Sequence, residues 1–340
     1  MLRYLTAGES HGEYLSGVLE GFPSGVRIAP EYISAQLRRR RLAPGRSARQ
    51  AIETDRCEVL SGLGGGATTG APIALLIKNS GRRPPTPSSL PRPGHADLPG
   101  MLKYGTLNAV QVRERASARE TAMRVALGSF ALRLLELLEV KIRSRVVSLG
   151  SRPVTTAKDA ADRLLRARRD GDTLGGVFEV TVENLPAGLG GFAQWDHRLG
   201  SRLGASLLGI NGVKGFEVGG GFALAALGGR AASGDLSLSG GLDAGMTNGR
   251  ALTLRCAVKP VPGLPGGALS TDLRTFRKEL SVSKTSDTSA VFAAAVIGEH
   301  AAALELASAL LEKFGGDSLP ELRRRLDEWR KDTGKILRRL

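Results

Sequence analysis

The chain has 340 residues, a formal net charge of +15, 41% hydrophobic residues and only 4% aromatic residues. This size suits a globular fold of one large or two modest domains, and we find no apolar run of about 18 residues that would span a membrane. Cys57 and Cys256 lack metal-ligand spacing and are too few for a disulfide framework, so we predict buried, reduced thiols. Met1–Thr6 has no signal-peptide pattern, so we expect an unexported, cytoplasmic protein.

The excess of positive charge attracts anions of every kind, nucleic acid included. The scarcity of aromatic residues leaves few stacking platforms for single-stranded nucleic acid. The sequence also lacks helix-turn-helix, zinc-finger and RNP-like patterns. We therefore favour small anionic ligands over nucleic acid, with charge-driven nucleic-acid binding as the lesser alternative.

In chain order, the first hundred residues predict four short strands: Leu2–Thr6, Gly17–Glu20, Cys57–Leu60 and Pro72–Ile77. Pro30 marks the first turn of a helix, which ends in the run Arg38–Arg41. Gly62–Gly70 reads as a flexible segment, and Asn79–Gly100 as a loop.

The middle of the chain begins with a capping box, in which Ser117 is the N-cap and Glu120 reaches back. The helix after it runs to about Leu138. Apolar residues from Trp195 to Ile210 recur at helical spacing. A further helix is expected at Ala157–Arg168. Further strands are expected at Lys141–Val147, Gly176–Val182, Val213–Ala226 and Ala251–Val258.

The end of the chain is helical. One helix spans Glu299–Phe314 and stops at two glycines; a second begins near Pro320 and directs Leu322, Leu326 and Trp329 to the core. The whole pattern is mixed α/β (α+β), without the steady strand–helix alternation of a doubly wound sheet. We find no convincing linker.

Three short segments combine a titratable group with an unusual backbone. His11 lies in a Gly/Ser turn, His95 lies between a Pro-Gly turn and Asp97, and Asp287 lies among small polar residues. A loop histidine is more often an exposed bystander than a catalyst, so each segment alone is a weak signal. We place His197 and His300 within helices and give them no functional role.

Arginines form a second group of candidates. Arg40, Arg46 and Arg49 leave one helix for a Pro/Gly turn, whereas Arg115 and Arg119 flank the start of another. Guanidinium groups bind carboxylate and phosphate through paired N–H bonds, and a helix start adds oriented backbone N–H groups. The alternative is a solvated basic face, which we prefer for Arg38 and Arg41.

These segments resemble, in sequence order, the signature blocks of the chorismate synthase family. The match covers nearly the whole chain and includes Gly8–Gly12, Leu37–Arg49, Glu58–Gly62, Arg92–Asp97, Lys103–Gly105, Glu114–Thr121, Gly188–Gly190, Trp195-Asp196, Val213–Gly215, Gly245–Gly249, Lys259-Pro260, Ser286-Asp287 and Glu312–Ser318. One five-residue motif could arise by chance, but a dozen in order could not.

The resemblance implies a β-α-β sandwich in a single domain over residues 1–340, with C-terminal helices at about 299–330. It also implies a homotetramer with flavin sites near subunit contacts. The family's reaction is the anti-1,4-elimination of phosphate from 5-enolpyruvylshikimate 3-phosphate to give chorismate. The reaction requires reduced FMN, and NADPH is a candidate reductant. Neither a membrane nor a nucleic acid is involved.

By resemblance, His11 is the acid that protonates the departing phosphate, and His95 protonates the reduced flavin. Asp287 acts with the flavin in removing the C6 proton. A histidine with an ordinary pKa near ~6.5 can supply a proton near neutrality. The flavin supplies electron density to the allylic carbon.

The same resemblance distributes the binding residues. The anionic substrate is assigned Ser10, Arg40, Arg46, Arg49, Arg92, Ser117 and Arg119. NADP is assigned Arg40 and Arg46. The flavin is assigned Arg115, Ala116, Ser117, Asn211, Gly212, Ala244, Thr247, Asn248, Lys259, Pro260, Val261, Pro262, Gly263 and Thr285.

Several positions depart from the family pattern. Thr285 replaces an arginine beside the proposed base, Ala244 replaces a glycine near the flavin, and Ala43-Pro44 replaces Gly-Tyr. The loop Asn79–Pro91 and the stretch Leu227–Gly241 are also shorter than usual. These changes motivate the alternative of a weakly active or inactive relative that binds an anionic ligand or a partner without turnover.

Overall fold

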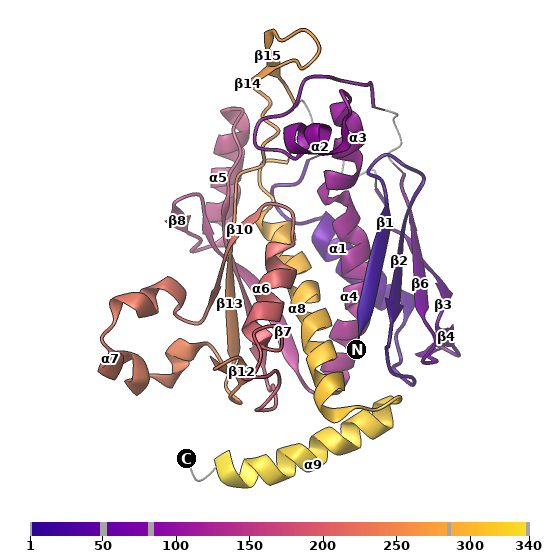
Figure 1. Cartoon of the computed structure of the whole chain (residues 1–340), viewed down its shortest axis with the longest axis vertical. Helices are drawn as coiled ribbons and strands as arrows, with labels where there is room; N and C mark the ends of the chain where they lie inside the picture. Colours follow the sequence, from indigo (N-terminus) through magenta and orange to yellow (C-terminus); the bar gives the residue numbers. More distant parts are fainter. Residues whose placement is uncertain (1, 48–52, 81–84, 284–286, 338–340) are drawn as a thin grey trace.

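The computed structural model describes residues 2–47, 53–80, 85–283 and 287–337. Two antiparallel sheets enclose a layer of helices (Figure 1). The first sheet has the strand order β1 (Arg3–Gly8), β2 (Tyr14–Glu20), β6 (Ile73–Lys78), β3 (Cys57–Ser61). The second has the order β10 (Val213–Val218), β13 (Leu252–Val258), β9 (Gly176–Glu183), β7 (Lys141–Leu149), β8 (Arg152–Pro153).

The first sheet turns one face to the helices and one outward. Along β2, Leu15 and Leu19 are fully buried whereas Val18 is 43% exposed, as the two-residue period of a strand requires. Gly17 lies on the inner face, where a Cβ atom would come within 2.6 Å of the Met123 side chain. The absence of a side chain here lets the sheet and the central helix pack closely.

The central helices are α1 (Pro30–Arg41), α4 (Thr121–Leu137) and α8 (Val291–Phe314). α4 and α8 carry apolar residues on all sides, because each has the partner helix on one side and a sheet on another. Gly128 of α4 lies against the backbone of His300 of α8 at their crossing. One continuous core joins both sheets and these helices.

Smaller elements surround this sandwich. α2 (Asp97–Tyr104) and α3 (Ala109–Ala116) lie at one end with the hairpin β14 (Ala268–Thr271)–β15 (Lys278–Ser281), and α9 (Leu319–Leu337) crosses the opposite end (Figure 1). The remaining elements are β4 (Leu63–Gly64), β5 (Ala67–Thr68), the 3₁₀ turns η2 (Ala118–Glu120), η3 (Gly221–Ala226) and η4 (Leu236–Ser239), α5 (Ala157–Arg169), α6 (Leu199–Leu208), α7 (Gly229–Gly234), β11 (Leu242–Asp243) and β12 (Met246–Thr247).

The structure confirms the mixed α/β class and most predicted elements, and it corrects several bounds. The last core helix begins at Val291, not at Glu299, since the Ser289 hydroxyl accepts from the Val291 N–H and the alanine run continues the helix. Trp195 is 76% exposed in a turn, so the helix expected from it starts only at Leu199. His197 lies in the same turn, outside any helix.

Three further expectations change in detail. The strand expected to reach Ala226 ends at Val218, because Gly219 and Gly221 have positive φ values of 59° and 48° and break the ladder. The segment 62–70 forms the hairpin β4–β5 instead of a structureless connection. The loop 79–100 ends in α2, which begins at Asp97.

The cysteines and α8 bear on the remaining compositional predictions. Both thiols are free; Cys256 is buried and Cys57 is half-buried, and burial raises the pKa of each to about 12. Among the described residues, α8 alone is long and apolar enough to cross a membrane, but 89% of its apolar window is buried inside the molecule. Burial of this kind is typical of a core helix.

Candidate functional site

Many of the predicted site residues that the structure describes lie where several elements end on the same side of the sandwich. The turn between β1 and β2 contacts α3 through a hydrogen bond from the Ser10 N–H to the Glu114 carbonyl, 3.0 Å. The loop after α1 contacts the segment before α8, since the Thr288 N–H donates to the Gly45 carbonyl at 2.8 Å. Segments distant in the sequence therefore meet at the N-terminal ends of α4 and α8.

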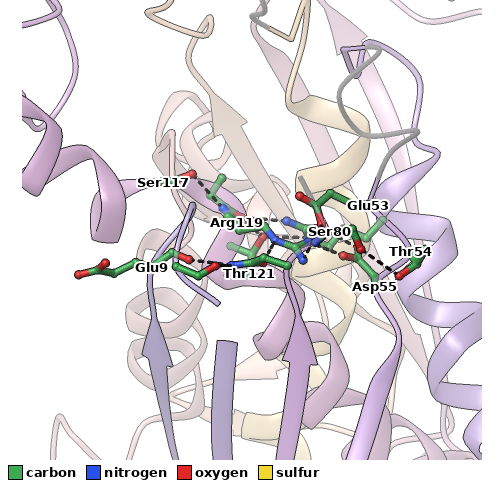
Figure 2. A network of polar contacts seen from close by, with 12 residues as sticks. Glu9, Glu53, Thr54, Asp55, Ser80, Ser117, Arg119 and Thr121 are labelled. Carbon is green, nitrogen blue, oxygen red and sulfur yellow. Dashed lines mark hydrogen bonds and ion pairs between the residues drawn. The ribbon is translucent and has the colours of Figure 1, made fainter. Parts of the chain in front are cut away.

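A buried ionic network centres on Arg119 (Figure 2). Its guanidinium donates to Asn79 Oδ1 at 2.8 Å, to Glu53 Oε2 at 3.3 Å and to the Asp55 carboxylate. The Asn79 amide in turn donates to the carbonyls of Glu9 and Gly12, at 3.0 and 2.9 Å, on either side of His11. Arg119 thus anchors the histidine turn through one intermediate side chain.

Arg40 is the most enclosed of the candidate arginines that the structure describes, with 1% of its surface exposed. It donates to Thr121 Oγ1 at 3.0 Å and to the Ala118 carbonyl at 2.9 Å, and it lies 3.6 Å from Asp55. Burial, followed by the charge of Arg46, lowers the pKa of Arg40 to about 9. The structure places this guanidinium beneath the site surface, where it supplies charge and holds the start of α4.

Arg46 and Asp287 form an ion pair. Arg46 NH1 lies 2.7 Å from Asp287 Oδ2, and the Ser47 N–H donates to Oδ1 at 2.7 Å. Gly45 makes this approach possible, because at its φ of +85° a Cβ atom would lie 2.9 Å from the Ser289 carbonyl oxygen. Arg49 and Thr285, both predicted site residues, lie outside the described residues.

His11 forms two hydrogen bonds with the carboxylate of Glu114. Its Nδ1 lies 2.7 Å from Glu114 Oε1, and its backbone N–H donates to Glu114 Oε2 at 2.7 Å. The side chains are 21% and 11% exposed. A carboxylate at Nδ1 orients the imidazole and leaves Nε2 as the nitrogen that can exchange a proton with a ligand.

His95 is paired with Asp97, whose side chain is fully buried. Its Nδ1 lies 2.5 Å from Asp97 Oδ1, and its Nε2 lies 3.3 Å from Arg92 NH2. Asp97 Oδ2 also accepts from the Arg92 backbone N–H at 2.8 Å and from Arg113 Nε at 2.6 Å. The structure brings Arg92, Asp97 and Arg113 together around this histidine.

The candidate catalytic groups lie on three sets of polar contacts. Asp287 forms an ion pair with Arg46, and the charge of Arg46 contributes to the lowered pKa of Arg40. A second set runs from Arg40 through Asp55, Arg119 and Asn79 to the turn of His11. The third surrounds His95, and its Arg113 is the sequence neighbour of Glu114, the partner of His11, on α3.

Comparison with known proteins gives a consistent answer. A family model described as chorismate synthase matches residues 2–311. A chorismate synthase from Caldanaerobacter subterraneus subsp. tengcongensis is 42% identical over 96% of this chain and 98% of its own length. One from Mycobacterium avium (strain 104) is 42% identical over 97% of this chain and 96% of its own length.

The chain belongs to the chorismate synthase family. A crystal structure titled "Crystal Structure of Chorismate Synthase" superposes with a TM-score of 0.78 and 34% sequence identity, covering 96% of this chain and 97% of that one. These findings confirm the family resemblance and the predicted fold class.

Within the chorismate synthase fold, part of the predicted flavin set lies beside His95. Lys259 donates its Nζ proton to the Gly94 carbonyl, and Gly94 lies near enough to Pro262 for an added Cβ to touch that ring at 3.5 Å. Burial and the charge of Lys214 lower the pKa of Lys259. The segment Lys259–Gly263 therefore lies directly against the His95 loop.

Another part of this set lies behind α3. The Asn211 amide donates to the Ala116 carbonyl at 3.0 Å, whereas Asn211 Oδ1 is buried and makes no hydrogen bond within the described part of the chain. Arg115 points toward β1, where it donates to the Thr6 carbonyl at 2.8 Å and the Gly8 carbonyl at 3.3 Å. In this arrangement Arg115 supports the strand.

Three other predicted flavin residues lie in a different part of the fold: Ala244, Thr247 and Asn248. Their hairpin contacts the start of α6, where the Leu199 N–H donates to the Gly245 carbonyl at 2.8 Å, whereas Asn211 follows the other end of that helix. The 10 residues of α6 span about 15 Å at the rise of an α-helix. One chain therefore does not bring Ala244 and Asn211 together.

Ser117 does not form the capping box that the sequence predicts. Its hydroxyl accepts from the Arg119 N–H at 3.3 Å and so caps the short turn η2, and α4 begins only at Thr121. Glu120 turns instead to Arg124, 3.0 Å away. The sequence pattern of Ser117 and Glu120 correctly predicted that a helical segment starts here, but it did not predict the hydrogen-bond partners of these side chains.

Sequence reasoning missed Glu53, Asp55, Asn79 and Glu114 as site residues. Asp55 has a positive φ of 49°, and its partner Arg119 is 64 residues away. Only Glu114 carried a usable signal, because it precedes the predicted Arg115–Arg119 group on the same helical segment. The others look like solvated loop residues until the fold brings them together.

Proposed function

We propose that this member of the chorismate synthase family eliminates phosphate from 5-enolpyruvylshikimate 3-phosphate, in the anti-1,4 sense, to give chorismate. The observation that supports it best is that His11 and His95 are each paired with a carboxylate while Asp287 is paired with Arg46. The fold alone would not justify an activity. These groups supply an acid, a base and anion-binding side chains.

The residues around His95 suit a flavin phosphate and ring. Lys259 provides a cation, and the buried Asn211 Oδ1 is an acceptor that a ligand N–H can satisfy. When bound there, reduced FMN supplies electron density to the allylic carbon as phosphate leaves. Asn211, Gly212 and Lys259–Gly263 are the residues that would hold it.

His11 is the proposed acid for the departing phosphate. Its Nδ1 is held by Glu114, and within the described residues its Nε2 has no hydrogen-bond partner, so Nε2 can deliver a proton to a phosphate oxygen. Protonation lowers the negative charge on the leaving group. Glu114 keeps the imidazole in one orientation while the proton moves.

Asp287 is the proposed base for the C6 proton. Arg46 and the Ser47 N–H bind one oxygen each, which fixes the plane of the carboxylate. Arg46, Arg92 and Arg119, with Ser10 and Ser117, are the proposed contacts for the substrate's phosphate and two carboxylates. NADPH is the proposed reductant, with Arg46 as its contact and Arg40 as a buried supporting charge.

A homotetramer is the proposed assembly. The outward face of the first sheet exposes Leu5, Val18 and Leu60 to 74%, 43% and 60%, and contiguous apolar surface of this kind marks contact sites. A site near a subunit contact would also allow Ala244 to reach a flavin from a neighbouring copy. The proposed location is the cytoplasm, and residues 1–340 are proposed as one domain.

The direct test supplies reduced FMN and 5-enolpyruvylshikimate 3-phosphate to the protein without oxygen and follows phosphate and chorismate. We expect both products in equal amounts, and none with oxidised FMN and no reductant. Binding of FMN and substrate without product would establish the non-catalytic alternative instead. The same preparation, titrated with single-stranded nucleic acid at physiological salt, tests the charge-driven alternative.

A further inference from the structure

The contacts of His95 decide which of its ring nitrogens carries a proton. Arg92 NH2 lies 3.3 Å from Nε2, and a guanidinium has N–H donors but no acceptor. Nε2 must therefore accept with its lone pair. The ring proton is then on Nδ1, which donates to Asp97 Oδ1 at 2.5 Å.

The other contacts of Asp97 agree with this tautomer. Its Oδ2 accepts from the Arg92 backbone N–H at 2.8 Å and from Arg113 Nε at 2.6 Å, and such donors favour an ionised carboxylate. An ionised carboxylate only accepts hydrogen bonds. Nδ1 must be the donor in this pair.

A proton on Nε2 of His95 would conflict with its contact to Arg92. It would set an Nε2–H against the N–H of Arg92, donor against donor. It would also add a third cation to Arg92 and Arg113, which already share the single carboxylate of Asp97. Lys259, bound to the Gly94 carbonyl, places a further positive charge beside the same loop.

His11 is arranged differently. Glu114 contacts its Nδ1, but among the described residues no guanidinium donates a hydrogen bond to its Nε2. Both histidines therefore have a carboxylate at Nδ1, but within the described part of the chain only His95 has a guanidinium at Nε2. The difference between them is Arg92.

We propose that Arg92 and Asp97 are positioning residues that hold His95 as the neutral Nδ1–H tautomer until an anionic ligand group binds the Arg92 guanidinium. Nε2 then loses its donor and takes a proton from solvent, and the added anion balances the new charge. The side chain of Arg92 is 24% exposed, so an anion can reach it. Only the identity of the natural anion rests on the proposed function.

The resting arrangement is tested by diethylpyrocarbonate, which acylates an imidazole nitrogen through its lone pair, with each histidine followed by peptide mass spectrometry. We expect His95 to react more slowly than His11 and the exposed His197, and Arg92→Gln to accelerate His95 alone. Arg113→Gln is the matched control, since it removes a second cation from Asp97 but no donor from Nε2. His300, fully buried, reports that the variants stay folded.

Equal reaction of His95 and His11 in the unaltered protein would overturn the proposal. So would an unchanged rate for His95 in Arg92→Gln. An equal acceleration in Arg113→Gln would show that general loosening of the cluster, not the Arg92 contact, controls Nε2. Each of these outcomes is read from a ratio between histidines in one sample.

The release step is tested with sulfate, an anion that does not titrate near neutrality. Calorimetric titrations in two buffers of different ionisation enthalpy measure the protons taken up on binding. We expect uptake in the unaltered protein, its loss in His95→Gln and its retention in His11→Gln. Binding without uptake, uptake that survives in His95→Gln, or no sulfate binding would each overturn the proposal.

These experiments do not depend on turnover. A protein that shows sulfate-linked proton uptake at His95 but makes no chorismate would refute the proposed function and leave this inference intact. An active enzyme without the uptake would do the reverse.

Discussion

At the scale of single residues, each candidate histidine depends on one carboxylate supplied by a neighbouring helix. Glu114 comes from α3 and Asp97 from the first turn of α2, so the orientation of both rings is set by elements that also pack on the fold. Because these pairs are held before any ligand arrives, little reorganisation is needed at the reacting groups.

His11→Ala should therefore reduce the rate of chorismate formation by about 10²–10⁴, the range for loss of a positioned general acid. The measurement is kcat with reduced FMN under anaerobic conditions. His197→Ala is the control, because His197 is exposed in the turn before α6 and should leave kcat unchanged. A His11→Ala enzyme with near-normal kcat would remove this residue from the mechanism.

His300 makes a prediction about pH. It is fully buried, its Nδ1 contacts the Val296 carbonyl at 2.7 Å, and its Nε2 has no hydrogen-bond partner among the residues that the structure describes. Burial lowers the pKa of His300; the Val296 carbonyl and Glu299 partly oppose this, and Arg39 adds to it. The folded state thus excludes a proton that the unfolded chain binds below its ordinary pKa of about 6.5.

The contribution of His300 to the free energy of unfolding should therefore be complete above about pH 6.5, and the free energy of unfolding should decrease as the pH falls below that value. His300→Leu should flatten this dependence, whatever its effect on stability at high pH. Urea unfolding at a series of pH values checks the difference in slope. Identical slopes for both proteins would show that other groups control the acid sensitivity.

At the scale of elements, the crossing of α4 and α8 controls the thickness of the helical layer. A Cβ atom on Gly128 would lie 2.6 Å from His300 Cβ and 2.9 Å from its carbonyl oxygen. Gly128→Ala should therefore destabilise the protein by about 1–3 kcal/mol, the usual cost of overpacking.

A second helical glycine supplies the control. No atom of the described residues lies within 4 Å of a Cβ added to Gly334 in α9, so Gly334→Ala should stabilise by about 0.5–1 kcal/mol through helix propensity. Urea unfolding of both variants should give shifts of opposite sign. Shifts of the same sign would mean that the α4–α8 contact does not limit packing.

The elements also show where sequence patterns succeed. β2, β6 and β13 bury every second residue, and strands of this kind leave a readable pattern in the sequence. α4 was predictable because it is apolar over most of its length. The start of α8 was not, because its first turn has no acidic residue and Ser289, which accepts from the Val291 N–H, is one of several small polar residues in a row. Asp55 and Asn79 were not predictable because their partner is distant in the chain.

At the scale of the whole molecule, the outward face of the first sheet exposes apolar side chains, among them Leu5, Val18 and Leu60. Leu5→Lys should introduce charge into the proposed subunit contact and reduce the mass of the assembly, measured by light scattering after gel filtration. Leu269→Lys, which alters a similarly exposed leucine on the β14–β15 hairpin, should leave the mass unchanged. A monomeric unaltered protein would refute the tetramer.

No helix or strand serves the site alone. Its polar residues lie at the ends of segments that also form the interior of the protein, as Arg119, Asn79, Asp55 and Arg46 do. Loosened packing in the sandwich should therefore displace the groups around the ligand. The catalytic rate should fall before the circular dichroism or fluorescence spectrum of the protein changes.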